Sequence, residues 1–330
     1  MTENGTPIDK DKGTWVTWRP EIKVLDCTVR DGGLVNDHAF DDALVRAVYD
    51  TCAAAGIDYM ELGYKGSERI FARDEFGPWK FCREEDMRRA VGDSPADVKL
   101  SVMADAERTD YKTDILPFDD SVLDLIRVAC YIHQIPLALD MVKDAHDKGY
   151  EVCLNLMAVS TVHENDLDDA LAVIAQSEAE TIYLVDSYGA FYSEEIHALC
   201  AKYLDACRST GKQLGFHGHN NQQLGYANTI EAIVAGANRL DATIGGLGRG
   251  AGNCPIELLL AFLKNPRYRL RPVLQCLRDH ILPLRKTMSW GYDLAYMITG
   301  QLNQHPRSAI QYYDDGDGDI VEFYDEMIEA

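Results

Sequence analysis

Two histidines separated by one residue, His217 and His219, are the side chains of this sequence best suited to chemistry. In a β-strand, side chains two positions apart point to the same face, so both imidazoles can reach one cation. Asp31, in the upstream segment 26–32, can add a carboxylate. Two histidines and one carboxylate are a set used for divalent metals that keep open coordination positions. The alternative interpretation is that one histidine is a core residue and the other lies in a loop.

Further polar residues accompany these three at the ends of β-rich runs. Barrel enzymes place their chemistry at the carboxyl ends of strands, and buried unpaired charges are costly unless they have a partner or a ligand. We therefore expect the following residues to meet at one rim: Arg30, Asp31, Glu61, Arg127, Asn155, Asp186, His217 and His219. A salt bridge inside the barrel is the alternative for Arg127 or Glu61.

A glycine-rich segment, residues 245–255, follows the last β-rich run and contains Arg249 and Asn253. Its glycines permit turns with positive φ and close approach of the backbone to a ligand. Arg249 adds a cation that can bind a substrate carboxylate or phosphate, or pair with the acidic surface. A flexible loop without a ligand is the alternative interpretation of the segment.

The elements that must position these residues repeat regularly between residues 22 and 264. Eight strand–helix units in about 240 residues predict a (β/α)₈ barrel, the TIM barrel. A doubly wound sheet is the alternative, but it usually has fewer strands and a glycine-rich turn after the first. The predicted strands are Lys23–Cys27, Tyr59–Leu62, Lys99–Met103, Asp124–Cys130, Glu151–Met157, Thr181–Asp186, Gln213–His219 and Arg239–Ile244. The predicted helices include Asp42–Ala55, Leu137–Lys148, Leu167–Gln176, Glu194–Arg208 and Gln222–Ala235.

The regions outside this repeat have their own expectations. Residues 1–21 predict a weakly ordered N-terminal arm, and residues 22–264 the catalytic barrel. Residues 265–330 predict a C-terminal helical extension that ends in a flexible acidic tail. The long segments 63–97 and 105–121 are candidate lids or binding loops.

Composition excludes several classes of function. The formal net charge of −22 argues against nucleic acid and anionic membranes as partners. No apolar run is long enough to span a bilayer, and the polar start lacks the apolar region of a signal peptide, so we expect a cytoplasmic protein. The nine cysteines have no Cys-x-x-Cys spacing and are interpreted as reduced core residues.

Three motifs together resemble those of the DRE-TIM metallolyases: Asp26-x-Thr28-x-Arg30-Asp31-Gly32, His217-x-His219 and the glycine-rich segment that ends at Asn253. That superfamily includes 3-hydroxy-3-methylglutaryl-CoA lyase and the isopropylmalate and homocitrate synthases. The segments 217–228 and 250–257 are most similar to the 4-hydroxy-2-oxoacid (pyruvate) aldolases. The resemblance covers most of residues 22–264.

The resemblance implies a role for each matching residue. Asp31, His217 and His219 would bind a divalent metal (Mn²⁺, Mg²⁺ or Co²⁺), with Asn253 as a ligand or close neighbour. Arg30 would be the catalytic arginine. Tyr292 resembles a tyrosine that the aldolases bring from their C-terminal helical region, and packing is its alternative role. The other expected roles are catalysis for Glu61 and His133, and substrate binding for Arg127, Asn155, Asp186 and Arg249.

Two positions depart from the aldolase pattern, and one of them is Arg249, where the aldolases have a small residue. At the other, the aldolases carry a histidine base four residues after the catalytic arginine, where this chain has Leu34. A water activated by the metal, His133 or His38 could accept the proton instead.

The resemblance implies a metal-dependent carbon–carbon lyase that cleaves or forms a bond between a 2-oxoacid and an aldehyde through a pyruvate enolate. It also implies association with an acylating aldehyde dehydrogenase, and we expect a homo-oligomer. One alternative is Claisen-type acyl-CoA chemistry, as a lyase or synthase, which predicts a basic surface that this acidic chain lacks. Another is a catalytically inactive metal-binding subunit.

Overall fold

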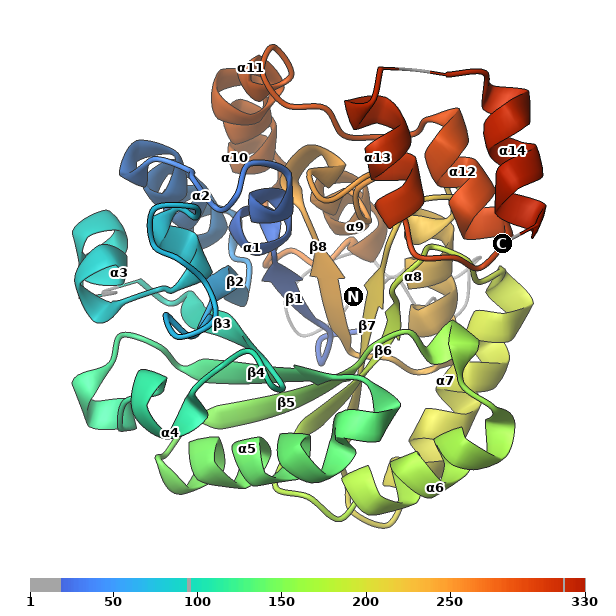
Figure 1. Ribbon diagram of the computed structural model, residues 1–330. Coiled ribbons are helices and arrows are strands. Elements are labelled where there is room, and N and C mark those ends of the chain that lie inside the picture. Colours follow the sequence, from blue (N-terminus) through green and yellow to red (C-terminus); the bar gives the residue numbers. More distant parts are fainter. Residues whose placement is uncertain (1–18, 94–95, 317, 330) are drawn as a thin grey trace, which may run out of the picture.

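The protein is described by a computed structural model that covers residues 19–93, 96–316 and 318–329. Within them, parallel strands close into one barrel in chain order, and β8 pairs with β1 (Figure 1). This closure confirms the predicted (β/α)₈ barrel and rules out the doubly wound sheet, which has two open edges. The strands are β1 (Lys23–Asp26), β2 (Tyr59–Tyr64), β3 (Lys99–Asp105), β4 (Leu125–Cys130), β5 (Glu151–Leu156), β6 (Thr181–Asp186), β7 (Gln213–Gly218) and β8 (Arg239–Ala242).

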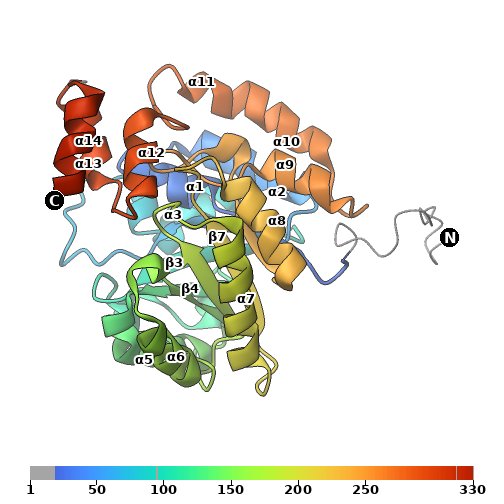
Figure 2. The same ribbon diagram turned by 90° about the vertical axis from the view of Figure 1, so that its right-hand side faces the viewer.

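Helices surround the barrel, and α10 packs outside this ring against α2 and α9 (Figure 2). The long helices follow the predicted ranges to within three residues, and α2 matches its range at both ends. The helices are α1 (Thr28–Gly32), α2 (Asp42–Ala55), α3 (Glu84–Val91), α4 (Tyr111–Asp114), α5 (Ile135–Asp147), α6 (Glu164–Ile174), α7 (Ser193–Cys207), α8 (Gly225–Ala235), α9 (Ile256–Leu263), α10 (Leu270–Cys276), α11 (Leu282–Leu284), α12 (Leu294–Gln301), α13 (Arg307–Asp314) and α14 (Ile320–Glu329).

The apolar core lies mainly between the strands and the surrounding helices, while a smaller cluster that includes Leu25, Leu125 and Tyr183 fills the barrel interior. All nine cysteines are buried and free, as predicted. Among the described residues, no helix is long and apolar enough to cross a membrane.

The chain turns sharply after β1, where the sequence predicted only the end of a strand. The carboxylate of Asp26 accepts hydrogen bonds from the backbone N–H of Thr28 (3.1 Å) and from its hydroxyl (2.7 Å). This local bonding competes with an extended backbone, and the next five residues form the short, fully buried helix α1. Arg30 and Asp31 therefore lie on a helical turn at the mouth of the barrel.

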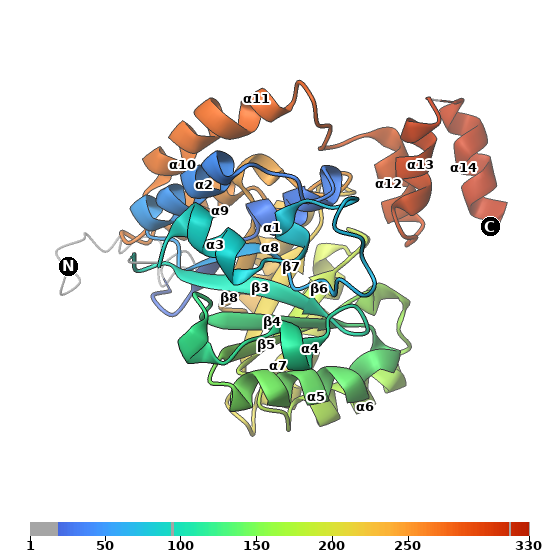
Figure 3. The same ribbon diagram turned by 60° about the vertical axis from the view of Figure 1, so that its left-hand side comes forward.

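The C-terminal helices α12, α13 and α14 form a group apart from those that surround the barrel (Figures 1 and 3). Their own small apolar core includes Ile298, Phe323 and Met327. The chain around the acidic run 314–319, predicted as a flexible tail, is flanked directly by α13 and α14. The apolar residues of α14 recur at helical spacing, and the helix packs on α12. The prediction of a flexible tail did not take this spacing into account.

Other predicted segments differ in detail from the structure. The candidate lid 63–97 contains α3, and the candidate loop 105–121 contains α4, so both are partly helical. Of the predicted N-terminal arm, residues 1–18 lie outside the described residues.

Candidate metal centre and active site

Asp31, His217 and His219 meet at the mouth of the barrel. One potential ligand atom from each lies within 4.8 Å of the other two. His217 Nε2 is 3.4 Å from Asp31 Oδ2, and the imidazole centroids are 5.1 Å apart. The side chains converge because β1 and β7 both pair with β8, so α1 and the end of β7 face each other across one strand.

The donor atoms of this group are buried without partners. Both carboxylate oxygens of Asp31 and Nε2 of His217 have no hydrogen-bond partner. Such atoms cost free energy in a folded protein, and each one needs an explanation. A divalent cation that bound here would satisfy all three atoms, so these residues fit the metal that the sequence predicts.

The protonation states of Asp31 and His219 also suit a metal. Burial opposes ionisation of Asp31, but Arg30 and the two histidines hold the pKa of its carboxyl well below the usual range. Burial lowers the pKa of His219 to about 3, so its imidazole is neutral near pH 7. An ionised carboxylate and a neutral imidazole are the forms that coordinate metal ions.

Asp241, in β8, orients His217. Its Oδ2 lies 2.9 Å from Nδ1 of His217, which leaves Nε2 facing Asp31. Carboxylates commonly hold metal-binding histidines in this way. Arg127 lies deeper in the barrel, fully buried, and donates hydrogen bonds to Asp241 and to Glu61.

Arg30 is held beside the metal donors. Its Nε donates to Glu61 Oε2 at 2.7 Å, and its Nη1 lies 3.6 Å from Asp31 Oδ2. The guanidinium carbon is 6.0 Å from the ring centroid of Tyr64. Arg30 is therefore a preorganised cation, of the kind that stabilises negative charge developing on a substrate.

A cavity of about 420 Å³ lies above the metal donors. Its wall comes from strand ends, from the glycine-rich segment after β8 and from the start of α13. The predicted site residues that line the cavity are Arg30, Asp31, Asn155, His217, His219 and Arg249.

Asn253 is not among the lining residues, but it lies against the metal donors. The Asn253 side chain is buried and its Oδ1 has no hydrogen-bond partner. The backbone of Asn253 forms an isolated antiparallel β-bridge with that of His219. Gly248 lies beside both Asn253 and Asp31. A Cβ at this position would lie 2.2 Å from Asn253 Nδ2 and 3.4 Å from Asp31 Cγ. The close approach of this backbone to both side chains requires glycine.

Three other predicted site residues lie beneath or beside the cavity rather than in its wall. Glu61 and Arg127 are fully buried and pair with each other. They hydrogen-bond Arg30 and Asp241 and are not lining residues of the cavity, so their expected roles in catalysis and substrate binding stay predictions. The carboxylate of Asp186 accepts a hydrogen bond from the backbone N–H of Ala190, and burial raises the pKa of Asp186 to about 7.

Tyr292 and His133 lie away from the cavity lining. The Tyr292 side chain is 48% exposed, and His133 is exposed with its ring stacked on Tyr131. The catalytic roles that the sequence predicts for them stay predictions, without support from this geometry.

Sequence reasoning missed several residues of the site. Asp241 carried a usable signal, because it is an acidic residue between Leu240 and Ala242 in a buried strand. His305 and Arg307 carried no such signal, since they lie far beyond the barrel in the chain and reach the cavity only through packing of the C-terminal helices. The other missed lining residues with polar side chains include Tyr64, Lys80, Asp105, Arg108, Tyr131 and Tyr188.

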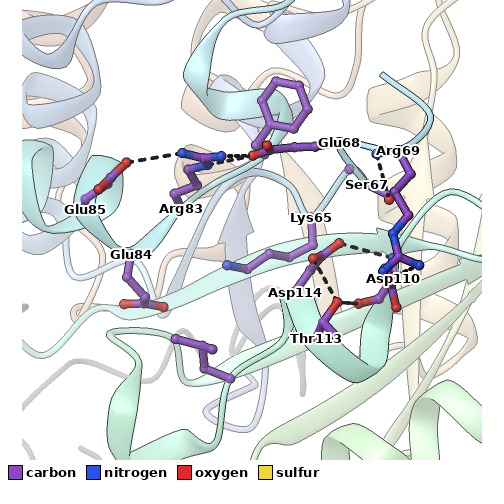
Figure 4. Close-up of a pocket in the computed structure, with 13 residues that line it drawn as sticks. Lys65, Ser67, Glu68, Arg69, Arg83, Glu84, Glu85, Asp110, Thr113 and Asp114 are labelled. Atoms are coloured by element: carbon purple, nitrogen blue, oxygen red, sulfur yellow. Dashed lines mark hydrogen bonds and ion pairs between the residues drawn. The ribbon is translucent and has the colours of Figure 1, made fainter. Parts of the chain in front are cut away.

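A second cavity, of about 510 Å³, lies beside α3 and α4 (Figure 4). Its charged groups are mostly satisfied: Lys65 donates to the carbonyl of Cys82 at 2.7 Å, and Arg69 pairs with Asp110 at 2.9 Å. Its lining includes no histidine. The chemistry of the protein therefore centres on the cavity above Asp31, although the other is larger.

Comparisons with known proteins agree with this site. Residues 129–280 match the HMGL-like family model. Oxaloacetate decarboxylase of Mycobacterium tuberculosis is 36% identical over 247 residues, which cover 73% of this chain and 69% of that protein. A 4-hydroxy-2-oxovalerate aldolase of Bacillus cereus is 30% identical over 264 residues, covering 76% of this chain and 71% of the aldolase.

A solved structure gives the same result. The N-terminal domain of a proposed aldolase from Bacteroides vulgatus superposes with a TM-score of 0.77 at 28% identity, and the match covers 91% of this chain and 99% of that one. The relatives named as lyases and the buried metal donors at the barrel mouth lead to one conclusion. The chain belongs to the HMGL-like family of the DRE-TIM metallolyase superfamily and is a metal-dependent carbon–carbon lyase.

Proposed function

We propose that the protein cleaves or forms the bond between a 2-oxoacid and an aldehyde through a pyruvate enolate. Asp31, His217 and His219 would hold the divalent cation, which is Mn²⁺, Mg²⁺ or Co²⁺. The observation that carries the proposal is a set of buried metal donors without partners directly beside Arg30. The relative from Bacillus cereus, named as a 4-hydroxy-2-oxovalerate aldolase, supports the same chemistry.

The bound cation would supply Lewis acidity toward the oxygen atoms of the 2-oxoacid. Arg30 donates hydrogen bonds to the keto oxygen, which becomes negatively charged as the bond between C3 and C4 breaks. Glu61 keeps the guanidinium in place through the bond to Nε, so no reorientation is needed during the reaction.

Aldol cleavage also needs a group that accepts the proton of the substrate hydroxyl, and Leu34, which lines the cavity, cannot do so. His38 packs on Tyr64 and is not a lining residue. Nδ1 of His305 accepts a hydrogen bond from the backbone N–H of Arg307, so the neutral ring carries its proton on Nε2 and acts as a donor.

Asp105, at the carboxyl end of β3, fits the role of proton acceptor best. It lines the cavity, and burial raises the pKa of its carboxyl. In aldol cleavage the hydroxyl proton passes to Asp105, the electron pair of the broken bond forms the enolate, and the aldehyde leaves. Protonation of the enolate at C3 then gives pyruvate.

A second candidate is decarboxylation of a 2-oxoacid that carries a carboxylate on C3. Leu34 favours it, because loss of CO₂ gives the same enolate without any proton acceptor. The relative named oxaloacetate decarboxylase supports this alternative.

Proton exchange tests the shared enolate. Pyruvate is incubated in D₂O with the protein and Mn²⁺, Mg²⁺ or Co²⁺, and deuterium in the methyl group is measured by NMR. Acetyl-CoA is treated in the same way in a parallel sample. Exchange into pyruvate is expected, whereas exchange only into acetyl-CoA would favour the Claisen alternative. Exchange into neither would favour an inactive metal-binding subunit.

Asp105→Asn separates the two reactions. The variant should lose aldol cleavage of 4-hydroxy-2-oxopentanoate but keep decarboxylation of oxaloacetate, because only the former needs a base. Glu107→Gln is the matched control, since that carboxylate also lines the cavity but accepts a hydrogen bond from Gln134. Leu34→His is then added to the Asp105→Asn variant. If the new histidine restores aldol cleavage, the function lost with the Asp105 carboxylate was that of the base.

The pH profile gives an independent check. A base must be ionised to act, so aldol turnover should fall as the pH drops through the raised pKa of Asp105. That acid limb should lie above the usual carboxyl range of about 4 and be absent from decarboxylation. An identical limb in both reactions would assign it to another group.

From the resemblance we also propose a homo-oligomer in the cytoplasm that passes its aldehyde to an acylating aldehyde dehydrogenase. Light scattering tests the oligomer, and co-purification from the native organism tests the dehydrogenase.

A further inference from the structure

Three arginines in the wall of the active-site cavity have no anionic partner among the described residues: Arg108, Arg249 and Arg307. The last two are considered together because both act on His305. Arg249 belongs to the glycine-rich segment after β8, and Arg307 is the first residue of α13. Within the described part of the chain, neither guanidinium has a carboxylate within the 4.0 Å of an ion pair. Nε of Arg249 is, in addition, buried without a hydrogen-bond acceptor.

Arg249 and Arg307 stay without such a partner although the chain is acidic. The sequence has 54 acidic and 32 basic residues, and exposed arginines such as Arg83 and Arg89 pair with nearby carboxylates. Free carboxylates are therefore abundant, but none approaches Arg249 or Arg307. The two cations face a cavity instead.

His305 lines the cavity together with the two arginines. The charge of Arg249 lowers the pKa of His305 and also that of His219, which lines the same cavity. Burial and, to a lesser extent, the charges of Arg249 and Arg307 lower the pKa of His305 to about 4. The two guanidinium groups therefore lie near the same imidazole, on the side of the cavity formed by the C-terminal helices.

The C-terminal helices are fixed to the barrel near this point. Asn303 donates a hydrogen bond to the carbonyl of Ser160 at 2.8 Å, and Asn221 donates to the carbonyl of Tyr296 at 3.3 Å. These contacts, one in α12 and one in the connection from α12 to α13, hold the segment that leads to Arg307 against the barrel. The backbone position of Arg307 at a helix N-terminus also favours an anion.

We propose that the cavity takes a substrate with a second anionic group, a carboxylate or a phosphate, which Arg249 and Arg307 bind. This inference rests on the proposed function for the other end of the substrate, where the 2-oxoacid group lies beside Arg30. Guanidinium groups match both anions, because their planar N–H donors can form paired hydrogen bonds with carboxylate or phosphate oxygens. A substrate with a neutral distal end would leave both cations uncompensated.

Binding of unreactive analogues tests the proposal without relying on turnover. 2-Oxoglutarate and 2-oxopentanoate have the same chain length. The far end of the chain is a carboxylate in 2-oxoglutarate and a methyl group in 2-oxopentanoate. Isothermal titration of the full chain with Mn²⁺ should give a Kd at least about tenfold lower for 2-oxoglutarate, which corresponds to about 1.4 kcal/mol. 2-Oxo-4-phosphonobutanoate is the third probe, and the tighter of the two dianions identifies the preferred anion.

Variants assign the preference to the two arginines. In Arg249→Gln and Arg307→Gln the ratio of the Kd values should fall several-fold, and in the double variant it should approach one. Arg208→Gln is the matched control, because Arg208 is 81% exposed on its side chain and pairs with Asp205 at the end of α7. It should keep the wild-type ratio, and thermal melts verify that every variant is folded.

Three results would overturn the proposal: a wild-type ratio near one, an unchanged ratio in the double variant, or an equal loss in Arg208→Gln. The deuterium exchange of pyruvate decides the proposed function separately. A dianion preference that depends on both arginines, in a protein that does not exchange the pyruvate methyl, would support the anion site and reject the aldol reaction.

Discussion

The two ends of the barrel interior hold charged groups of similar types, but they differ in how many of these groups are left unsatisfied. At the amino-terminal end, Glu151 accepts hydrogen bonds from Tyr59 (2.8 Å), Lys99 (2.9 Å) and Arg239 (3.3 Å). At the carboxyl end, both oxygens of Asp31 and Nε2 of His217 have no hydrogen-bond partner, although Oδ2 of Asp31 lies 3.4 Å from that nitrogen.

This difference separates a structural ion cluster from a functional one. The amino-terminal cluster consists of Tyr59, Lys99, Glu151 and Arg239. Only Nε of Arg239 lacks a hydrogen-bond acceptor there, because the other charged groups bond to one another. The carboxyl-terminal cluster needs a ligand to reach the same state. Unpartnered donors therefore indicate function more directly than the presence of charge does.

The largest expected effect follows removal of a metal donor. Asp31→Asn keeps the shape of the side chain but loses the anionic oxygen, so metal affinity should fall by about a hundredfold or more and turnover should disappear. Titration with Mn²⁺ followed by electron paramagnetic resonance measures the affinity. Wild-type metal affinity in the folded variant would exclude Asp31 as a ligand.

Arg30→Ala should have the next largest effect. Loss of a preorganised donor to the developing charge costs about 10²–10³ in rate, while the metal donors remain in place. Steady-state kinetics and the Mn²⁺ titration measure the two quantities separately. Normal turnover would remove Arg30 from the mechanism.

Asp241→Asn compares the two clusters directly. The variant weakens the hold on His217, so metal affinity should fall by about 10–100-fold. Glu151→Gln at the opposite end is its counterpart and should lower the unfolding free energy by about 1–3 kcal/mol without a change in metal affinity. Equal metal affinities in the two variants would show that Asp241 only stabilises the barrel.

The smallest effects are expected outside the cavity. Tyr292→Phe and His133→Ala should each change turnover by less than about tenfold, or 1.4 kcal/mol, because neither residue lines the cavity. A loss of a hundredfold in either variant would instead support the catalytic role that the sequence predicts. It would also require the C-terminal helices or the end of β4 to move toward the metal donors.

Much of the site was accessible from the sequence. The His217–His219 spacing, the position of Asp31 after the first strand and the eight-fold repeat were enough to predict metal donors converging at a barrel mouth. They suffice because strand periodicity and closure of a parallel barrel are local rules that act on the chain order. The same rules placed Arg30 and Asn155 at the rim.

The sequence by itself therefore determined the barrel and its metal donors, whereas the tertiary structure decided which charges are paired. Glu61 and Arg127 were predicted as site residues because they lie at strand ends, and in the folded barrel they form an ion pair with each other. Arg307 showed no pattern, yet the packing of α12–α14 brings it over the cavity. Strand direction is encoded locally, but whether a charge has a partner depends on contacts between residues far apart in the chain.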